Sequence, residues 1–305
     1  MGERLWVSNY SLDDVSGGAE VLGSQFCKAM KLKYMSRSKM GVNTSEEMDE
    51  RLSKMPIDLL VYNSTNCWSR KPRTNKSIAV CCEHFDKESK CLDNQEFKIS
   101  KAKEWLLQRK ALENADKIIS ISEGEYISFR KSGFKTIIIE PYIDLETFRP
   151  NKKITRKREN LIALFIGRNH SRKGYDIVIE LQKRFSNINF LIQTTGNLTN
   201  EVINDLYNMA DFLIMPSRYE SFGYIYAEAL ATNLPIISSR VGLFETWQPE
   251  QYGIFPKEIT VDAFEDAINE FISGKRPFAN SRELAEQRFS YKRFKEDCDG
   301  LLSNW

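Results

Sequence analysis

The sequence contains no stretch that approaches a membrane span, which needs roughly 18 to 20 consecutive and mainly apolar residues. Its first residues, Met-Gly-Glu-Arg-Leu-Trp, lack a signal-peptide profile, and Trp6 stands where a myristoylation signal requires serine or threonine. These absences argue against a secreted or membrane-spanning protein. We therefore expect a cytoplasmic protein, with peripheral contact at a membrane surface as an alternative.

Cysteine and histidine, which build most transition-metal sites, are few and scattered. The six cysteines form no Cys-x-x-Cys pair, and Cys81 and Cys82 point to opposite faces of one predicted strand. Asp297 and Asp299 form an Asp-x-Asp sequence, but within a predicted helix rather than a loop after a strand. We therefore expect no disulfide and no bound metal. The fingerprint G-x-G-x-x-G is absent after the first strand, which argues against an NAD cofactor.

Net charge is low, at +2 with an isoelectric point of about 8.1, which is too mild for a dedicated nucleic-acid-binding protein. The positive charge is nevertheless concentrated in two groups. They are Lys28, Lys31, Lys33, Arg37 and Lys39, and then Arg70, Lys71, Arg73 and Lys76. Such groups are usually solvated surfaces, and contact with anionic lipid or with an acidic acceptor is the alternative.

Strand-like apolar runs alternate with helix-like segments along the whole chain, as expected of parallel α/β sheets. In the first half we predict strands at 4–8, 59–62, 77–82, 117–121 and 136–139, with helices at 19–30, 45–55, 98–115 and 123–132. In the second half we predict strands at 161–166, 190–193, 212–215 and 235–238, with helices at 175–184, 200–209, 224–231, 261–273 and from residue 291 onward.

The polar and basic stretch 151–159 separates the two halves and is interpreted as a linker. We therefore predict two Rossmann-like domains, over residues 1–150 and 160–290, followed by a final helix at 291–305. Two such domains around a linker would face each other across a cleft.

Two glutamates, Glu220 and Glu228, follow the buried strand predicted at 212–215. Glu220 falls in the loop after the strand, and Glu228 falls two turns into the next predicted helix. In open α/β sheets, ligands bind at the carboxyl ends of the strands. Carboxylates accept hydrogen bonds from paired hydroxyls, and a helix N-terminus offers N–H groups to phosphate. This arrangement favours a sugar or a ribose as the ligand.

Two further motifs follow strands of the first half. Gly17 and Gly18 open a helix, where paired glycines allow close approach of a ligand to the backbone, although a plain glycine turn is an equal alternative. His84 lies just past the strand 77–82, beside Glu83 and Asp86. A lone histidine is more often structural, but this one could donate a hydrogen bond to a sugar hydroxyl or to developing negative charge.

A basic loop follows the first strand of the second half. Between Gly167 and Gly174 it carries Arg168, Arg172 and Lys173. Arginine presents a planar fork of donors and lysine a compact charge, which together suit a diphosphate. A solvated basic loop would explain the charges but not the two framing glycines. His170, in the same stretch, is interpreted as an ordinary loop residue.

In combination, these motifs resemble glycosyltransferase family 4, whose members have the GT-B fold. The matching segments are Gly17-Gly18, 115–123, 141–150, Gly167-Arg168 with Lys173-Gly174, and 217–223 through 228–231. The resemblance runs from about Ser16 to Ser290 and marks a short member of the family. It implies that the final helix crosses back onto the first domain.

The resemblance also implies roles for individual residues. Arg168 and Lys173 would hold the donor diphosphate and assist its departure, Glu228 would bind the ribose, and Glu220 would bind the donor sugar. His84 would approach that sugar from the other domain. The implied catalytic residues are His84, Arg168, Lys173 and Glu220. The implied donor-binding residues are Gly17, Gly18, Arg168, Lys173, Glu220, Ser221, Phe222, Gly223 and Glu228. Members retain the anomeric configuration and generally need no metal.

The sequence departs from the family pattern at several places. A helix–strand unit that usually lies between the strand ending near Gln193 and the helix at 200–209 is missing, and its loop commonly helps to hold the nucleobase. Asn233 stands where a glycine is usual, and Val241-Gly242-Leu243 replaces the usual glycine pair. The nucleobase, the donor sugar and the acceptor are therefore left open.

These observations predict a metal-independent, retaining glycosyltransferase. It would move a sugar from a nucleotide diphosphate donor to a hydroxyl acceptor, which could be a saccharide, a lipid-linked compound or a small molecule. A sugar-nucleotide epimerase of the same fold is an alternative, although it would need additional acid–base groups that two histidines barely supply. A noncatalytic sugar-nucleotide-binding protein would be expected to lack Glu220, Arg168 or Lys173, and all three are present. Nucleic acid is disfavoured as a substrate by the near-neutral charge.

Overall fold

A computed structural model describes residues 2–8, 17–64, 74–151, 160–196, 198–247, 250–274 and 279–305. Three predicted features lie outside these residues. They are Ser16, the basic side chains Arg70, Lys71 and Arg73, and the linker between residues 152 and 159. The chain divides into two compact units. The first contains Met1–Pro141 with Phe294–Trp305, and the second contains Tyr142–Arg293.

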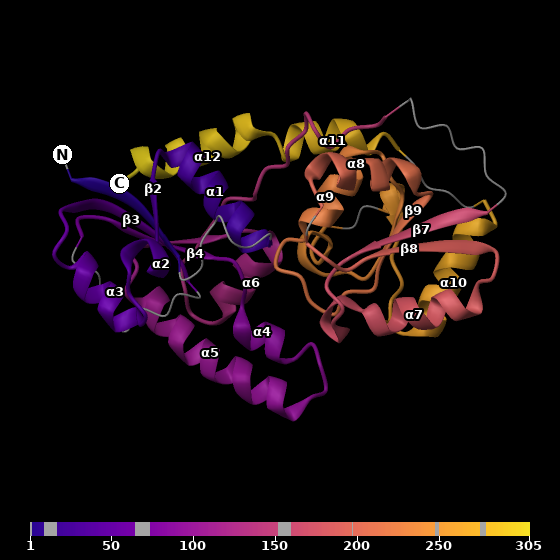
Figure 1. Cartoon of the computed structure of the whole chain (residues 1–305), viewed down its shortest axis with the longest axis horizontal. Coiled ribbons are helices and arrows are strands. Elements are labelled where there is room, and N and C mark those ends of the chain that lie inside the picture. The colour runs from indigo at the N-terminus through magenta and orange to yellow at the C-terminus, as the bar shows by residue number, and fades with distance from the viewer. Residues whose placement is uncertain are drawn as a thin grey trace. The chain divides into compact units, whose positions relative to one another are not determined.

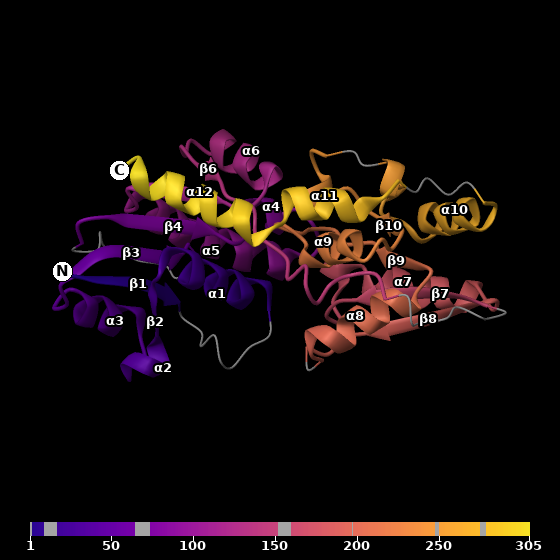
Figure 2. The same ribbon diagram turned by 90° about the horizontal axis from the view of Figure 1, so that it is seen from above.

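The first unit is built on a parallel sheet with strand order β2-β1-β3-β4-β5-β6. Its strands β2, β1, β3 and β4 can be followed in Figures 1 and 2. Its strands are β1 (Glu3–Ser8), β2 (Lys33–Ser36), β3 (Ile57–Asn63), β4 (Ser77–Cys81), β5 (Lys117–Ser120) and β6 (Ile137–Ile138). The central strands β3 and β4 are almost wholly buried. Helices cover both faces of such a sheet, which is why these strands are continuous apolar runs rather than alternating ones.

Helices form a layer on each face of this sheet. They are α1 (Gly18–Met30), α2 (Arg37–Met40), α3 (Ser45–Leu52), α4 (Phe85–Ser89), α5 (Gln95–Glu113), α6 (Glu123–Lys131) and α12 (Tyr291–Ser303). Helices α1 and α12 lie side by side on one face, and α3 and α5 lie on the other (Figures 1 and 2).

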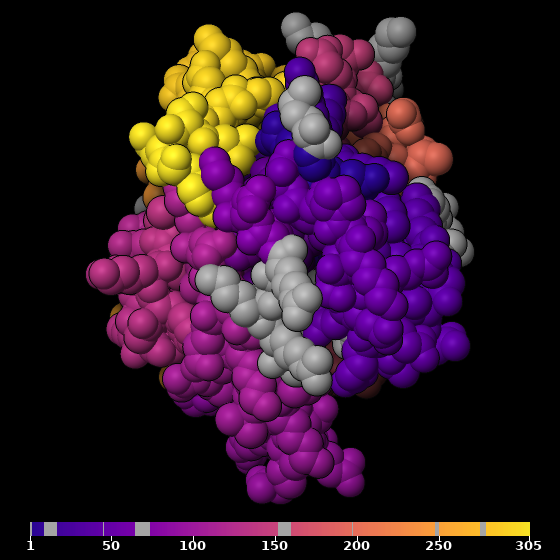
Figure 3. Space-filling view, turned by 90° about the vertical axis from the view of Figure 1, so that its left-hand side faces the viewer, coloured from indigo at the N-terminus to yellow at the C-terminus, as the bar shows by residue number. Residues whose placement is uncertain are grey.

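The last helix, α12, packs on the first unit, as predicted. The Phe294 ring meets the Phe26 ring of α1 edge-on at 5.1 Å between centroids. The Lys117 ammonium donates to the backbone oxygens of Leu301 (3.2 Å) and Asn304 (3.0 Å). Figure 3 shows the yellow atoms of the last residues beside the indigo atoms of the first ones.

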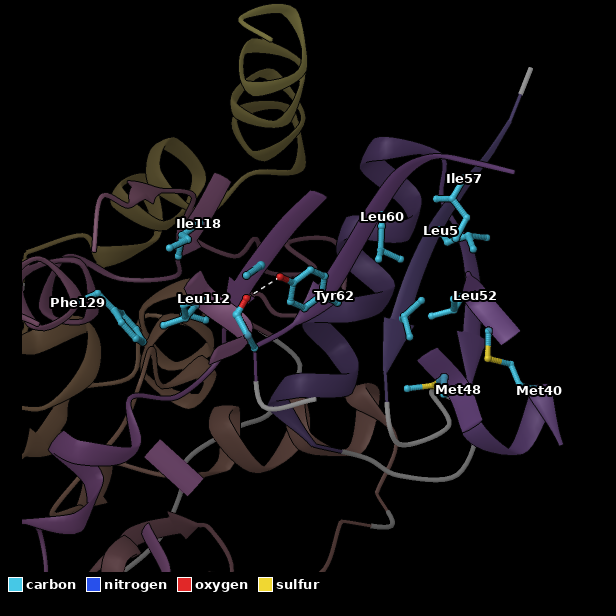
Figure 4. Close-up of a cluster of buried hydrophobic side chains, with 14 residues drawn as sticks. Leu5, Met40, Met48, Leu52, Ile57, Leu60, Tyr62, Leu112, Ile118 and Phe129 are labelled. Carbon is cyan, nitrogen blue, oxygen red and sulfur yellow. Dashed lines mark hydrogen bonds between the residues drawn. The ribbon is translucent and has the colours of Figure 1, made fainter. Parts of the chain in front are cut away.

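The core between the sheet and the α3–α5 layer consists of interlocking apolar side chains (Figure 4). It includes Leu5, Met48, Leu60, Tyr62, Leu112 and Phe129. Tyr62 is the tyrosine of this cluster, and its buried hydroxyl has a hydrogen-bond partner, because it donates to the backbone oxygen of Ala111 at 2.7 Å. A buried polar group that is hydrogen-bonded carries little penalty.

The second unit has a smaller parallel sheet with strand order β11-β10-β9-β7-β8. Its strands are β7 (Leu161–Ile166), β8 (Ile188–Gln193), β9 (Phe212–Met215), β10 (Ile236–Ser238) and β11 (Gly253–Ile254). Its helices are α7 (Tyr175–Arg184), α8 (Asn200–Met209), α9 (Tyr224–Ala231), α10 (Val261–Ile272) and α11 (Ser281–Arg288), with 3₁₀ turns at Ser171–Lys173, Gly242–Phe244 and Glu250–Tyr252.

The parallel α/β prediction is confirmed, but some elements have other bounds than predicted and several short ones were not predicted. Helix α5 begins at Gln95, earlier than predicted, because the Asn94 side chain accepts a hydrogen bond from the Phe97 amide at 2.9 Å. Helix α4 was not predicted, and its cap is the imidazole of His84. The short elements β2, α2, β11 and α11 were also missed, because too few residues carry a periodic signal.

Candidate active site

The loops that carry Arg168, Lys173 and Glu220 lie at one edge of the second unit's sheet. Strands β7, β9 and β10 are neighbours and run parallel, so their carboxyl ends lie together. The loops that follow them are 167–174, 216–223 and 239–245. This edge is where ligands bind in open α/β sheets.

Lys173 and Glu220 form the central contact of this edge. The Lys173 ammonium donates to both carboxylate oxygens of Glu220 at 2.7 Å, and the Ser217 hydroxyl donates to one of them at 2.9 Å. The side chains of Lys173 and Glu220 are only 17% and 9% exposed. Burial would raise the pKa of Glu220, but the charges of Lys173 and Arg172 and these hydrogen bonds hold that pKa below its usual value. Glu220 is therefore an ionised, nearly buried carboxylate.

Gly174 allows the basic loop to approach the Glu220 loop this closely. Its φ of +72° lies in the left-handed region, and a Cβ there would stand 2.1 Å from the backbone oxygen of Pro216. No other residue fits without moving the backbone. The second framing glycine of the basic loop is therefore required by packing beside Lys173.

The loop after β10 closes against the Glu220 loop in the same way. Gly242 has a φ of +59°, and a Cβ there would stand 2.6 Å from the Phe222 oxygen and 2.8 Å from the Glu220 Cβ. The Leu243 amide donates to that same Phe222 oxygen at 2.8 Å. Val241-Gly242-Leu243 replaces the glycine pair that is usual in the family. Gly242 is retained at the position where a side chain would collide with the Glu220 loop.

Asn233, the other departure from the family pattern, also has a structural reason. Its φ is +58°, a conformation that asparagine tolerates better than most residues. Its side-chain oxygen accepts hydrogen bonds from the Ser281 hydroxyl (3.1 Å) and the Arg282 amide (2.8 Å). Asn233 therefore adopts the left-handed backbone conformation that glycine usually provides. Its side chain also connects the end of α9 to the start of α11 by hydrogen bonds.

Glu228 lies in α9 in a different environment from Glu220. Its carboxylate accepts a hydrogen bond from the Tyr207 hydroxyl at 2.7 Å. Tyr207 itself is fully buried. Desolvation by the surrounding protein raises the pKa of Glu228 to about 7, against the lowering effect of the Tyr207 hydrogen bond. The two predicted carboxylates are therefore distinct, because Glu220 is ionised at neutral pH whereas Glu228 is balanced between its two forms.

Arg168 follows β7 and is exposed, and within the described part of the chain its guanidinium has no partner. Gly167, just before it, extends the pairing of β7 with β8, because the Gly167 amide donates to the backbone oxygen of Gln193 at 3.0 Å. His170 lies in the exposed loop, as expected. Its Nδ1 also accepts a hydrogen bond from the Arg172 amide at 2.9 Å and caps the 3₁₀ turn that carries Lys173.

The remaining predicted residues belong to the first unit. Gly17 is the N-cap of α1, which begins at Gly18. His84 is buried, with its ring stacked on Trp105 at 4.6 Å between centroids. Its Nδ1 accepts a hydrogen bond from the Lys87 amide (3.2 Å), and its Nε2 lies 3.2 Å from the Ser132 hydroxyl.

Burial lowers the pKa of His84 to about 4, so the ring is neutral at physiological pH. Both ring nitrogens have protein partners. To reach a donor sugar, as the family resemblance implies, His84 would have to exchange its contact with Ser132. The role of His84 stays a prediction.

Two contacts of the site were missed from the sequence. Ser217 precedes Glu220 by three residues, a spacing from which a loop hydrogen bond could have been predicted. Tyr207 lies 21 residues before Glu228 on another helix, and no local pattern indicates that contact. Within the described ranges, no group of three His, Cys, Asp or Glu side chains could hold a metal ion. None of the described helices is long and apolar enough to cross a membrane.

Glu228 leads to a pH prediction. If the ionised carboxylate binds ribose hydroxyls, affinity for a bare nucleoside should be constant above the pKa of about 7 and should fall below it, approaching tenfold per pH unit. Calorimetry from pH 5.5 to 8.5 would measure this with whichever of uridine, guanosine and adenosine binds, because a nucleoside has no phosphate to titrate in that range. Glu228→Gln should remove the dependence. An unchanged pH profile in that variant would assign the titration to another group.

Comparison with known proteins finds similarity to glycosyltransferases. Residues 148–274 match the family described as glycosyl transferases group 1. A D-inositol 3-phosphate glycosyltransferase of Mycobacteroides abscessus is 23% identical over 237 residues, covering 65% of this chain and 53% of that protein. The corresponding protein of Mycolicibacterium smegmatis is also 23% identical over 237 residues and is covered over 54% of its length. The chain thus spans about half the length of these curated relatives.

Two solved structures extend the likeness to the whole chain. Sucrose-phosphate synthase from Thermosynechococcus elongatus superposes with a TM-score of 0.82 at 17% identity, covering 100% of this chain and 99% of that one. HepE from Anabaena, in complex with UDP and glucose, superposes with a TM-score of 0.73 at 14% identity over the full length of both. The chain therefore has the GT-B fold of glycosyltransferases, and its segment matching the group 1 family contains Arg168, Lys173, Glu220 and Glu228.

Proposed function

We propose that this protein is a retaining glycosyltransferase of family 4, which transfers a sugar from a nucleotide diphosphate donor to a hydroxyl acceptor without a metal ion. The observation that carries the proposal is the contact of Lys173 with Glu220 at the carboxyl edge of the second sheet. It brings one cation, suited to phosphate, next to one ionised carboxylate, suited to sugar hydroxyls. The homologous enzymes and the HepE complexes with UDP and UDP-glucose support this choice of donor class.

The geometry leaves capacity for a ligand at both groups. A lysine ammonium has three donors, and Lys173 uses two of them on Glu220. An ionised carboxylate has about four acceptor positions, of which Lys173 and Ser217 occupy three on Glu220. The third donor of Lys173 is then available for a phosphate oxygen, and the fourth acceptor position of Glu220 for a sugar hydroxyl.

The proposed reaction is a displacement on one face of the sugar. The acceptor oxygen forms a bond to the anomeric carbon as the bond from that carbon to the diphosphate breaks. The departing phosphate oxygen takes the proton of the acceptor hydroxyl, so attack and departure occur on the same face and the configuration is retained. Lys173, with Arg168, stabilises the charge that develops on the diphosphate, and Glu220 holds the sugar in place.

A binding panel tests the donor class. Thermal unfolding is measured with UDP, GDP, ADP and their glucose derivatives, because a ligand at a hundred times its Kd stabilises a protein by about 2.7 kcal/mol. We expect at least one nucleoside diphosphate to raise the melting temperature, with its sugar derivative hydrolysed slowly in the absence of an acceptor. No shift with any of them would contradict the proposal.

Turnover is expected to be independent of metal, because cations of the protein take the place of a divalent ion at the diphosphate. Donor hydrolysis or transfer is measured in excess chelator and compared with untreated enzyme. The rates should agree within about twofold. Activity that disappears with chelator and returns with Mg²⁺ or Mn²⁺ would show that a metal neutralises the leaving group instead.

A further inference from the structure

Arg218 connects the loop that carries Glu220 to the beginning of α7. Its guanidinium donates to both carboxylate oxygens of Asp176, Nη1 to Oδ1 at 2.8 Å and Nη2 to Oδ2 at 2.7 Å. The same group donates to the backbone oxygen of Ser171. The Arg218 amide donates to the backbone oxygen of Arg172 at 2.8 Å. One residue thus makes four hydrogen bonds, two to the basic loop and two to the first turn of α7.

These bonds bracket the contact between Lys173 and Glu220. Arg218 lies two residues before Glu220, and its partners lie on both sides of Lys173, at Ser171 and Arg172 before it and at Asp176 after it. A bidentate arginine–carboxylate pair fixes orientation as well as distance, because the planar fork has a single matching geometry. The charge and hydrogen bonds of Arg218 also hold the pKa of Asp176 below its usual value, against the effect of burial, so this carboxylate is ionised.

We propose that Arg218 and Asp176 are positioning residues of the donor site, which hold the two loops in the register that brings Lys173 to Glu220. The proposal rests on the function proposed above. Neither residue needs to touch the donor, because Asp176 already neutralises the Arg218 guanidinium. They act through the placement of the ammonium and the carboxylate.

A positioning role and a merely stabilising one predict different results. The two side chains are 21% and 50% exposed, so water partly screens the pair, and its contribution to stability should be modest compared with that of a buried ion pair. A reacting group displaced by about 1 Å, in contrast, can slow a reaction about a hundredfold. Loss of the Arg218–Asp176 pair should therefore lower kcat strongly while the melting temperature changes little.

The chain offers a matched control on the same helix. Arg184, at the other end of α7, pairs with Asp262 and Glu265 on the surface. Arg184→Ala removes a comparable surface ion pair far along the helix from Lys173. Its kcat should stay within about twofold of wild type, and its melting temperature should match that of Arg218→Ala within a few degrees.

The test is a double-mutant cycle with donor turnover as the first measurement. Arg218→Ala and Asp176→Ala should each lower kcat by about tenfold to a hundredfold. The double variant should be no slower than the slower single variant, because both changes break one unit. Arg218→Lys should fail to rescue the rate, since it lacks the fork. Losses that multiply in the double variant, or a kcat of Arg218→Ala equal to that of Arg184→Ala, would overturn the proposal.

A second measurement does not depend on activity. Labelling of Lys173 by an amine-reactive reagent is followed by mass spectrometry, with Lys183 on the surface of α7 as an internal reference. We expect Lys173 to label several-fold faster in Arg218→Ala than in wild type or Arg184→Ala. Asp176→Asn, which keeps the side-chain shape, replaces Arg218→Ala if that variant does not fold. If wild type shows no transfer, the proposed function fails, and the labelling rates still decide the positioning role. Equal rates in all variants would refute it.

Discussion

Replacing Lys173 by alanine should lower kcat by about a hundredfold or more, because a positioned donor at developing charge typically contributes that much. The ammonium lies 2.7 Å from both oxygens of Glu220 and has one donor left for the diphosphate. Its contribution should grow as the diphosphate departs and gains charge, so the loss should fall on kcat more than on the KM of the donor. Steady-state kinetics on the identified donor measures both.

A control is needed because Lys173→Ala leaves the buried Glu220 carboxylate without its ion-pair partner. Removing one partner of a buried ion pair typically costs about 3–5 kcal/mol, because the other charge stays buried without compensation. Lys173→Ala should therefore also unfold at a lower temperature. The double variant Lys173→Ala with Glu220→Ala should recover part of that stability but none of the rate. Recovery of both would show that the lysine acts only by neutralising Glu220.

Arg168 provides an independent check of the diphosphate assignment. Arg168→Ala should weaken binding of a nucleoside diphosphate while leaving the nucleoside unaffected, and Arg168→Lys should restore only part of the affinity because it lacks the planar fork. Calorimetry with the nucleoside diphosphate that the thermal panel identifies, and with its nucleoside, compares the two ligands directly. If neither Arg168→Ala nor Lys173→Ala loses preference for the diphosphate, the loop between Gly167 and Gly174 is a solvated surface.

Replacing Glu220 by glutamine should abolish most turnover while sparing, or even strengthening, the binding of a bare nucleoside diphosphate. The change keeps the shape of the side chain but removes the charge that holds Lys173. Glutamine keeps one acceptor oxygen, so one of the two Lys173 donors that Glu220 occupies becomes available to the diphosphate in addition to the third. Loss of a hydrogen bond between a charged group and the sugar typically costs about 1.5–3 kcal/mol, so transfer should fall by at least tenfold.

Glu228→Gln is the matched comparison, because it lies in the same segment and carries the same change. It should weaken bare-nucleotide binding, since Glu228 is assigned to the ribose, and its effect on turnover at saturating donor should be smaller. Equal nucleotide affinities in wild type and in both variants would refute the ribose assignment. Weaker nucleotide binding in Glu220→Gln than in Glu228→Gln would reverse the two roles.

Much of the second unit could be predicted from the sequence, because its elements carry strong local signals. Strand β9 is a short apolar run closed by Pro216, and α7 and α8 show apolar periodicity, with Thr199 capping the start of α8. Their bounds agree with the prediction. The position of Glu220 in the loop after β9 followed directly from that reading.

Contacts between distant residues could not be predicted, because neither local propensity nor periodicity encodes them. The pairing of Lys173 with Glu220 depends on β7 and β9 being neighbours, which the order of elements along the chain does not state. The environment of His84 was equally hidden, since its aromatic neighbour Trp105 lies in another helix. The sequence pattern of a single histidine after a strand is the same whether its side chain is exposed to a ligand or buried against other side chains.

The assignment of Phe294–Trp305 to the first unit has a consequence for biosynthesis. The first unit is begun before the second but completed after it, because the segment that covers Phe26 leaves the ribosome only when the whole of Tyr142–Arg293 has been made. At about 5–20 residues per second, the synthesis of Tyr142–Arg293 takes roughly 8 to 30 seconds. During that time the apolar surface of α1 that contacts Phe294 is not yet covered by α12. We therefore expect chaperones to bind nascent chains that have completed residues 1–141 but not yet α12.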